Sequence, residues 1–464
     1  MKGHASRVLA VLFLAALILV LLLSDAYLDN AKNLWRRVQA EIVARRPHPE
    51  FVPTPLPYDD AALVTRPTPP RAAALRPLVT AMPDVALPPQ APAVATTALA
   101  GPGATPPLTP PPPRRPVVPT ITSAPALAVV APQPTPPRLV ASRGAELPSA
   151  AQLPGVTHIW QTWNNCGPAT LAMYLSHFGQ KVRQEEVGAQ LRPDPDDKNV
   201  GLEEMAAYAR SRGLSATVRA NGDAARLRRL ILAGVPVLIE TWHQERPNDG
   251  MGHYRLLTGY DDAAGHWIAY DSYDARDLVK GQPYTGIRLP YEETERLWAV
   301  FNRQYLVIYD AAATRGVLPI LNEDVDEATM WARALAHAQA ELETRPDDPY
   351  AWFNLGSDLV ALGRAKEAGQ AYDRARRIGL PWRMLWYQFG PFQAYYETGR
   401  YDEVIALANA TIATARQTEE AFYWRGLAQK AKGDVVAARA SWQRAVELNP
   451  HYVDASAALA TIGE

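Results

Sequence analysis

The chain has 464 residues, which is too long for one ordinary domain and long enough for two or three. Its 47 basic and 48 acidic residues give a formal net charge of -1, so no global field favours nucleic acid or an anionic substrate. Cys166 is the only cysteine, which excludes an intramolecular disulfide framework and leaves either a buried apolar thiol or a reactive one.

The first element in chain order is an apolar run of 16 residues at 8–23, preceded by Lys2 and Arg7. Its length lies between the core of a signal peptide and a full membrane span. Since no convincing small-residue cleavage site follows, we expect residues 1–46 to hold a cytoplasmic start, a signal anchor and a juxtamembrane segment. A cleaved signal peptide is the alternative. The anchor implies a single-pass protein of the cell membrane with extracytoplasmic C-terminal domains, and cleavage implies a secreted protein.

The segment 47–154 holds 29 of the 42 prolines of the chain. Proline removes a backbone donor and fixes φ, so neither sheets nor helices are expected here. We predict a disordered linker with polyproline character, which acts as a spacer between a membrane and the later domains. A docking segment for proline-recognising domains is the alternative interpretation.

The next unit, 155–312, mixes helical and strand patterns. The expected elements are helices at 169–178, 202–212 and 223–233, and strands at 235–242, 253–260, 266–273 and 304–309. The turn-rich segment 261–265 is short enough to join the second and third strands as a hairpin. Helices followed by an antiparallel sheet are typical of the α+β class.

The chemistry centres on the stretch QTWNNCGPATLAMYL, which contains Cys166. Proline is favoured in the first turn of a helix, so Gly167 and Pro168 predict that the thiol lies at a helix N-terminus, where the dipole stabilises a thiolate. Five residues upstream, the side-chain amide of Gln161 can join the Cys166 backbone N–H in an oxyanion hole.

A thiol nucleophile also needs a base and a group that orients the base. His253 opens a predicted strand and is the preferred base, with His243 as the rival. Asp271 ends the next strand, and the hairpin would bring its carboxylate to the His253 ring. Asp274 and Asp277 are the alternatives to Asp271. The histidines interpreted as surface or turn residues are His158, His177 and His266.

The last unit, 326–464, has helical patterns and an internal repeat. Gly363, Gly399 and Gly433 recur at steps of 36 and 34 residues, each at a predicted turn between helices. The segments AWFNLGSDL and GRAKEAGQAYDRA resemble the tetratricopeptide repeat, whose helix pairs stack to bury faces that no single pair can bury. The resemblance covers most of 345–450.

The resemblance implies an all-α solenoid with a concave surface for a peptide or protein partner, while a scaffold that only packs on its neighbour is the alternative. Gly390 and Pro391 argue against a regular first helix in the middle repeat. The final segment, YVDASAALATIG, is interpreted as a capping helix.

The blocks HIWQTWNNCGPATLAMYL, GHYRLLTGYDD and WIAYDSY together resemble the bacteriocin-processing, double-glycine type cysteine peptidases, especially their stand-alone members. The resemblance covers about 155–310 and implies a papain-like fold that cleaves peptide bonds without a metal or cofactor. It implies Cys166 as nucleophile, His253 as general base and acid, Asp271 as the orienting residue and Gln161 as oxyanion donor.

Two positions depart from the family pattern. Arg255 stands where the family usually has an apolar residue, and Ser272 follows Asp271 where proline is common. Neither change removes a catalytic group, although Arg255 would bring a charge to the site if it faces that way. The predicted function is a membrane-anchored, extracytoplasmic cysteine peptidase acting on a peptide or protein, with no nucleic-acid partner. The alternatives are a catalytically degenerate binding or scaffolding protein and acyl transfer instead of hydrolysis.

Overall fold

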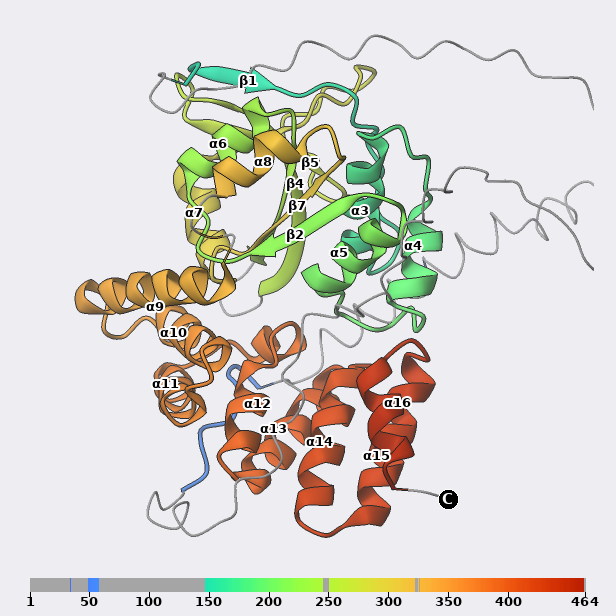
Figure 1. Ribbon diagram of the computed structural model, residues 1–464, viewed down its shortest axis with the longest axis vertical. Coiled ribbons are helices and arrows are strands. Elements are labelled where there is room, and N and C mark those ends of the chain that lie inside the picture. Colours follow the sequence, from blue (N-terminus) through green and yellow to red (C-terminus); the bar gives the residue numbers. More distant parts are fainter. Residues whose placement is uncertain are drawn as a thin grey trace, which may run out of the picture. The chain divides into compact units, whose positions relative to one another are not determined.

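The computed structural model describes residues 34, 49–57, 147–244, 250–321, 324 and 326–462 (Figure 1). All of them belong to the compact unit that comprises residues 1–78 and 138–464. The apolar run at 8–23 and the central part of the expected linker lie outside the described residues. In the part that is described, no helix combines the length and the hydropathy needed to cross a membrane.

A seven-stranded antiparallel sheet organises the first half of this unit. Its strands are β1 (Ala150–Gln152), β2 (Ser215–Arg219), β3 (Val237–Gln244), β4 (Gly250–Asp261), β5 (His266–Asp271), β6 (Ile287–Pro290) and β7 (Tyr305–Tyr309). The strand order is β2-β7-β3-β4-β5-β6, and β1 pairs with β4. The expected hairpin is confirmed, because Asp261 at the end of β4 pairs with His266 at the start of β5.

Helices cover both faces of this sheet (Figure 1). Alternate residues of β3 belong to two separate cores, since Leu238 packs with the first set of helices while Val237 and Ile239 pack with the second. The first set is α3 (Cys166–Ser176), α4 (Gln184–Leu191) and α5 (Leu202–Ser211). The second set is α6 (Ala224–Leu232), α7 (Tyr291–Ala299) and α8 (Thr314–Leu321).

The expected α+β pattern is confirmed in the helices α3, α5 and α6 and in the strands β3, β4, β5 and β7. The predicted Asp223 cap is also present, because its carboxylate accepts a hydrogen bond from the Arg226 N–H at 2.8 Å. Sequence patterns did not predict α4, β2, β6 or α7. These elements are short, and their burial depends on neighbours that are distant in the sequence.

The C-terminal region is helical (Figure 1). Its elements are α9 (Glu327–Thr344), α10 (Pro349–Ala361), α11 (Ala365–Ile378), the 3-10 helix η3 (Trp382–Trp386), α12 (Gly390–Glu397), α13 (Tyr401–Thr414), α14 (Glu419–Ala431), α15 (Val435–Leu448) and α16 (Val453–Ala460). Gly363, Gly399 and Gly433 lie at the turns between helices and have φ values of 74°, 74° and 88°, which favour glycine.

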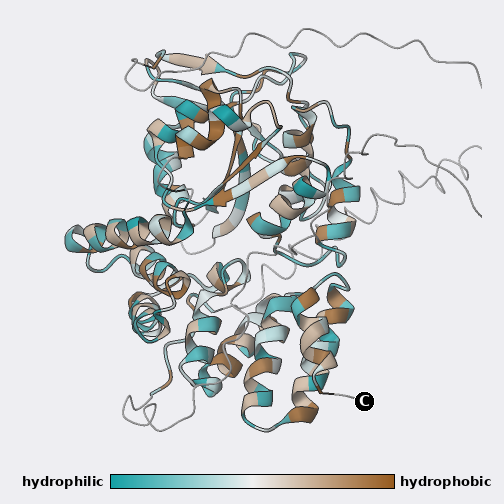
Figure 2. Ribbon diagram, viewed as in Figure 1, coloured by the Kyte–Doolittle hydropathy of each residue, from teal (hydrophilic) through white to brown (hydrophobic). Residues whose placement is uncertain are grey.

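The middle repeat is irregular, as the sequence predicted. A short 3-10 helix precedes α12, which has only eight residues and begins at Gly390 and Pro391. A Cβ on Gly390 would lie 2.1 Å from the Tyr372 hydroxyl, so no larger residue fits there. Figure 2 shows apolar and polar residues interleaved along the helices of the C-terminal region, as expected of amphipathic helices that pack on their neighbours.

A third core joins the repeats to the sheet region. Trp242 of β3 and Phe301 after α7 are buried in one apolar cluster with side chains of the repeats such as Tyr372. Beside this cluster, the Asn302 side-chain amide donates to the Asp358 carboxylate at 2.6 Å, and the interface is therefore part of the folded unit.

The two ends of the predicted linker are bound to the folded unit and do not behave as a free spacer. At its N-terminal end the Val52 N–H donates to the Leu380 carbonyl at 2.8 Å, which places this segment on the repeats. At its C-terminal end β1 pairs with β4, and the Leu153 N–H donates to the Thr258 carbonyl at 2.8 Å. Both ends of the proline-rich segment are therefore attached to the folded unit.

Candidate active site

Cys166 is the first residue of α3, as predicted, and is half-buried. Pro168 lies in the first turn of the helix, where its missing N–H costs no intrahelical bond. Gly167 lets the helix approach the sheet, because a Cβ there would lie 3.3 Å from Val200 and 3.4 Å from the Tyr254 ring. The helix start therefore holds the thiol against β4.

His253 and Asp271 are brought together by the β4–β5 hairpin. The register pairs Arg255 with Asp271, and His253 lies two residues earlier on the same face of β4. The His253 Nε2 lies 2.9 Å from the Asp271 Oδ1. The His253 side chain also lies beside the Cys166 thiol, whose pKa it lowers. The structure therefore brings Cys166, His253 and Asp271 together.

Asp271 is fully buried, and its carboxylate has several partners besides the histidine. Its Oδ1 also accepts hydrogen bonds from the backbone N–H groups of Tyr273 and Asp274, both at 2.8 Å. Its Oδ2 accepts from the Arg255 Nε at 2.9 Å. These donors fix the carboxylate with one edge toward the His253 ring.

Arg255 is the first of the two departures from the family pattern, and its charge does face the site. The side chain is 2% exposed and also donates through Nη1 to the Thr241 hydroxyl on β3. A charge is costly to bury unless it is paired, and Asp271 supplies that pairing. Arg255 therefore supports the carboxylate that orients His253.

Ser272 is the second departure, and it holds Gln161. The Gln161 N–H donates to the Ser272 carbonyl at 2.9 Å, and the Ser272 hydroxyl donates to the Gln161 side-chain oxygen at 2.8 Å. The side-chain NH₂ of Gln161 has no acceptor among the described residues, which leaves it able to donate to a developing oxyanion. Proline at position 272 could not make the side-chain contact.

Replacing Ser272 by alanine is expected to lower kcat about tenfold with little change in KM, because one hydrogen bond that orients Gln161 is lost. Steady-state kinetics on a cleaved peptide checks this. In a Gln161→Ala background the same replacement should have no further effect. An equal loss in both backgrounds would contradict a role for Ser272 that acts through Gln161.

The electrostatics of the three residues favour a charged pair. Burial raises the pKa of the Cys166 thiol, but the hydrogen bond and charge of His253 and nearby backbone N–H groups outweigh it, and the pKa falls below its usual value. Burial lowers the pKa of His253, but the Asp271 carboxylate and the bonds to Asp271 and Cys166 raise it to about 9. The favoured state is a thiolate beside an imidazolium.

The rival residues have other roles. The His243 ring lies 5.7 Å from both the His253 ring and the Tyr273 ring. Asp274 binds Arg276 at 2.6 Å, and Asp277 accepts the Arg288 N–H at 3.2 Å. Neither aspartate replaces Asp271.

His158 differs from its interpretation as a surface or turn residue. Its ring stacks on Tyr284 at 3.5 Å, and its Nε2 lies 2.7 Å from the Asp271 backbone carbonyl. It therefore supports the strand end that carries Asp271.

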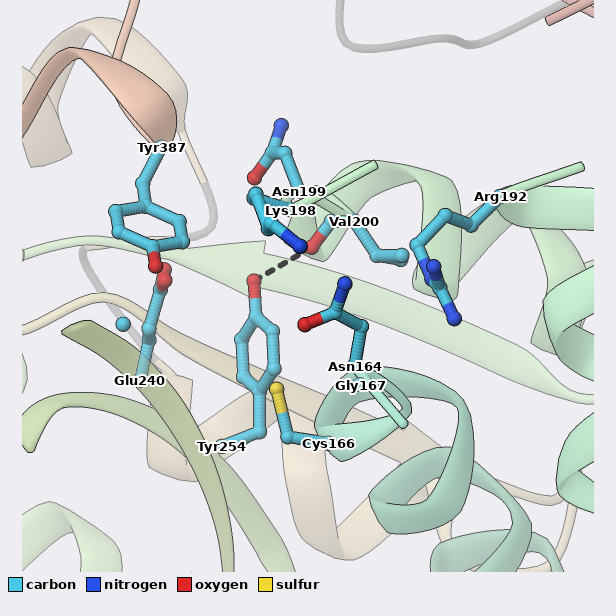
Figure 3. Close-up of a pocket in the computed structure, with 11 residues that line it drawn as sticks. Asn164, Cys166, Gly167, Arg192, Lys198, Asn199, Val200, Glu240, Tyr254 and Tyr387 are labelled. Atoms are coloured by element: carbon cyan, nitrogen blue, oxygen red, sulfur yellow. Dashed lines mark hydrogen bonds between the residues drawn. The ribbon is translucent and has the colours of Figure 1, made fainter. Parts of the chain in front are cut away.

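A small pocket adjoins Cys166 (Figure 3). The residues that line it are Asn164, Cys166, Gly167, Arg192, Lys198, Asn199, Val200, Glu240, Gly252, Tyr254 and Tyr387. The Tyr254 hydroxyl donates to the Val200 carbonyl at 2.6 Å across this pocket. Burial, followed by the charge of Cys166, raises the pKa of Glu240 well above its usual value, which favours the neutral carboxyl group.

Tyr387 reaches this pocket from the repeats, between η3 and α12. Its ring packs edge-on against Trp242 and Phe301, and a Cβ on Gly252 would lie 3.1 Å from it. Sequence patterns did not indicate Tyr387, since it is more than 200 positions from Cys166. One sequence feature could have indicated Glu240 as a site residue, since it is an acidic residue within the apolar run VPVLIETW.

Residues 147–306 match the model of the Peptidase_C39 like family. This match supports a cysteine peptidase domain over about a third of the chain, and it does not extend to the helical repeats. No curated protein matches the chain.

Two solved structures have local likeness to the chain. A Bacillus anthracis protein that bears the name of a C39-like peptidase is 16% identical, covers 35% of this chain and 98% of its own, and has a TM-score of 0.28. A MamA RS-1 double mutant is 19% identical, covers 28% of this chain and 72% of its own, and has a TM-score of 0.26. At these scores neither likeness bears on function.

Proposed function

We propose that the domain of residues 147–306 is a cysteine peptidase that hydrolyses peptide bonds through Cys166, His253, Asp271 and Gln161. The observation that carries the proposal is the position of His253, which bonds to the buried Asp271 carboxylate at 2.9 Å and lies beside the Cys166 thiol, whose pKa it lowers. A histidine that only packed in the core would not need these two partners in line.

In the proposed mechanism the Cys166 thiolate attacks the carbonyl carbon of the scissile bond, and an S–C bond forms as the C=O electrons move to oxygen. The Gln161 amide and the Cys166 backbone N–H stabilise this oxyanion. When it collapses, the C–N bond breaks and the His253 imidazolium gives its proton to the leaving amine. Water then attacks the thioester carbonyl while His253 takes a proton from it. The C–S bond breaks as the acid product leaves, which restores the Cys166 thiolate beside the His253 imidazolium.

The residues that surround Cys166 and His253 assist these steps. Asp271 holds the imidazolium in place and stabilises its charge, and Arg255 holds Asp271. The backbone N–H groups that lower the thiol pKa lie at the start of α3 and on β4, and they favour a charged nucleophile before the substrate arrives. Glu240 and the rings of Tyr254 and Tyr387 limit the room next to the thiol. A slim peptide chain with small side chains at the cleaved bond therefore suits the site best.

The experiment that tests the proposal is digestion of a diverse peptide mixture with the purified chain, read by mass spectrometry. Cleavage by the wild type and none by Cys166→Ala are expected. An added amine would appear in the products if the acyl group were transferred and not hydrolysed. If neither protein yields new peptides while the wild type still binds peptides, the domain is a degenerate receptor. The Tyr387 side chain in the pocket favours this outcome.

We further propose that the repeats bind a protein or peptide and that residues 8–23 anchor the chain in the cell membrane, with the peptidase outside the cytoplasm. This rests on the apolar run and the flanking charges in the sequence. Protease added to intact cells should degrade the C-terminal repeats. Full protection of the repeats, with degradation only after lysis, would contradict this topology.

A further inference from the structure

Residues 50–57, EFVPTPLP, form an extended arm that lies on the repeats. The arm pairs with the segment that follows α11, through a bridge between Phe51 and Pro381 and a hydrogen bond of 2.8 Å from the Val52 N–H to the Leu380 carbonyl. The Trp382 N–H lies 3.4 Å from the Glu50 carbonyl. The first half of the arm is therefore held like an added strand.

The second half of the arm is held by two buried charges. Arg376 of α11 donates from Nε to the Pro53 carbonyl at 2.8 Å, and Glu403 of α13 accepts the Leu56 N–H at 2.8 Å. The side chains of Arg376 and Glu403 are 1% and 3% exposed and bond to each other at 2.8 Å. Each charged group thus uses one edge for its partner and the other edge for the arm.

This pair belongs to a larger neutral network that fixes its geometry. Arg400 bonds to Asp373 at 2.8 Å, and the Tyr395 hydroxyl donates to the Asp373 carboxylate at 2.8 Å. Arg376 Nη1 in turn donates to the Tyr395 hydroxyl at 3.1 Å. We call the surface that these residues form against the arm the groove. Because its charges are already paired with one another, the groove is organised to accept a peptide carbonyl and a peptide N–H.

The arm also fits the groove through its side chains. Val52 is 3% exposed and belongs to the apolar core of the repeats. Phe51 lies over Gly379, where a Cβ would come within 3.2 Å of the ring and where φ is 124°. The prolines at 53, 55 and 57 favour an extended polyproline form, so little conformational freedom is lost on binding.

We propose that this groove is a recognition site for extended, proline-containing peptides with an aliphatic residue before a proline, and that residues 50–57 are its resident ligand. The occupant is the chain's own arm. A polypeptide of the same chemistry would compete for the groove, and the arm would then be released. The inference rests on the binding role proposed for the repeats, but it does not require hydrolysis by Cys166.

The test measures whether the arm binds in trans. A fluorescein-labelled peptide of residues 48–58 is titrated with the purified full-length chain, as the wild type and as Val52→Asp, and polarisation is read. The Val52→Asp arm should leave the groove, so this variant is expected to bind the peptide at least tenfold more tightly than the wild type does. Binding to neither protein, or equal binding to both, would overturn the proposal.

Changes in the peptide test the contacts without any risk of unfolding the protein. A peptide N-methylated at Leu56 loses the donor to Glu403 and is expected to bind the Val52→Asp chain about tenfold to a hundredfold more weakly. N-methylation at Thr54, whose N–H has no partner among the described residues, is the matched control and should have a small effect. Equal affinity of the two methylated peptides would show that this groove does not hold the peptide. Since no step depends on Cys166, failure here leaves the peptidase proposal untouched.

Discussion

Replacing Asp271 by asparagine is expected to lower peptide hydrolysis by about 10²–10⁴-fold. The neutral amide cannot raise the pKa of His253 or stabilise the imidazolium. The same change leaves Arg255 buried without its ion-pair partner, so the free energy of unfolding should fall by roughly 3–5 kcal/mol. Peptidase assays and denaturant unfolding measure the two effects on the same preparation.

Two further variants separate the two effects. Asp274→Asn alters a part-exposed pair with Arg276 on the same loop and should cost at most about 1 kcal/mol. Adding Arg255→Met to Asp271→Asn removes the unpaired charge and should restore part of the stability, but none of the activity. A single Asp271→Asn protein that keeps wild-type stability and activity would contradict the role assigned to the carboxylate.

The stability of the chain is expected to fall as pH rises from about 5 to 8, because acidic groups are buried where the repeats meet the peptidase domain. Burial, followed by the charge of Glu419, raises the pKa of Glu204 to about 8. Burial and the charge of Glu204 raise the pKa of Glu420 to about 7. The Asn199 amide donates to the Glu420 Oε1 at 2.8 Å, which places this carboxyl at the contact between the two regions.

The sign follows from proton linkage. The folded pKa values of Glu204 and Glu420 lie above the usual 4.5, so the unfolded chain releases these protons first. Their contribution to stability is complete below that value and is lost as pH rises through about 7 to 8. After allowance for partial solvent screening, the loss should be on the order of 3 kcal/mol for the two groups together.

Glu420→Gln should flatten this dependence and raise the free energy of unfolding at pH 8 by about 1–2 kcal/mol, with little change at pH 5. Urea unfolding at both pH values measures it. Glu447→Gln is the matched control, since its carboxylate makes an exposed surface pair with Arg444. If Glu420→Gln destabilises the protein equally at both pH values, the carboxyl is charged in the folded state and the explanation is wrong.

Local sequence predicted much of the site, and the physical reasons can be named. Gln161, Cys166 and Pro168 lie within eight positions, so helix capping and dipole arguments apply to them directly. His253 and Asp271 are further along, but a hairpin with a four-residue turn, 262–265, and a register shift between Leu257 and Gly259 brings them together. Short-range rules therefore covered the residues that carry the proposed chemistry.

Long-range packing explains what sequence patterns missed. Arg255 was noted only as a departure, and its buried bond to Asp271 depends on three strands. Tyr387 reaches the pocket from an irregular repeat, where no periodic pattern applies. The arm around Val52 falls in the segment predicted to be a spacer. Proline-rich composition does not indicate that this arm binds a groove formed by residues more than 300 positions later.

The pairing of a Cys166 thiolate with His253 is tested by the rate at which iodoacetamide alkylates the chain between pH 5 and 9. Cys166 is the only cysteine, so every label reports on this site. We expect a wild-type rate that is nearly constant from about pH 6 to 8 and at least about tenfold faster at pH 6 than the rate of His253→Ala. The His253→Ala rate should rise with the titration of an ordinary thiol near pH 8.5. A wild-type profile that coincides with that of His253→Ala would contradict this pairing.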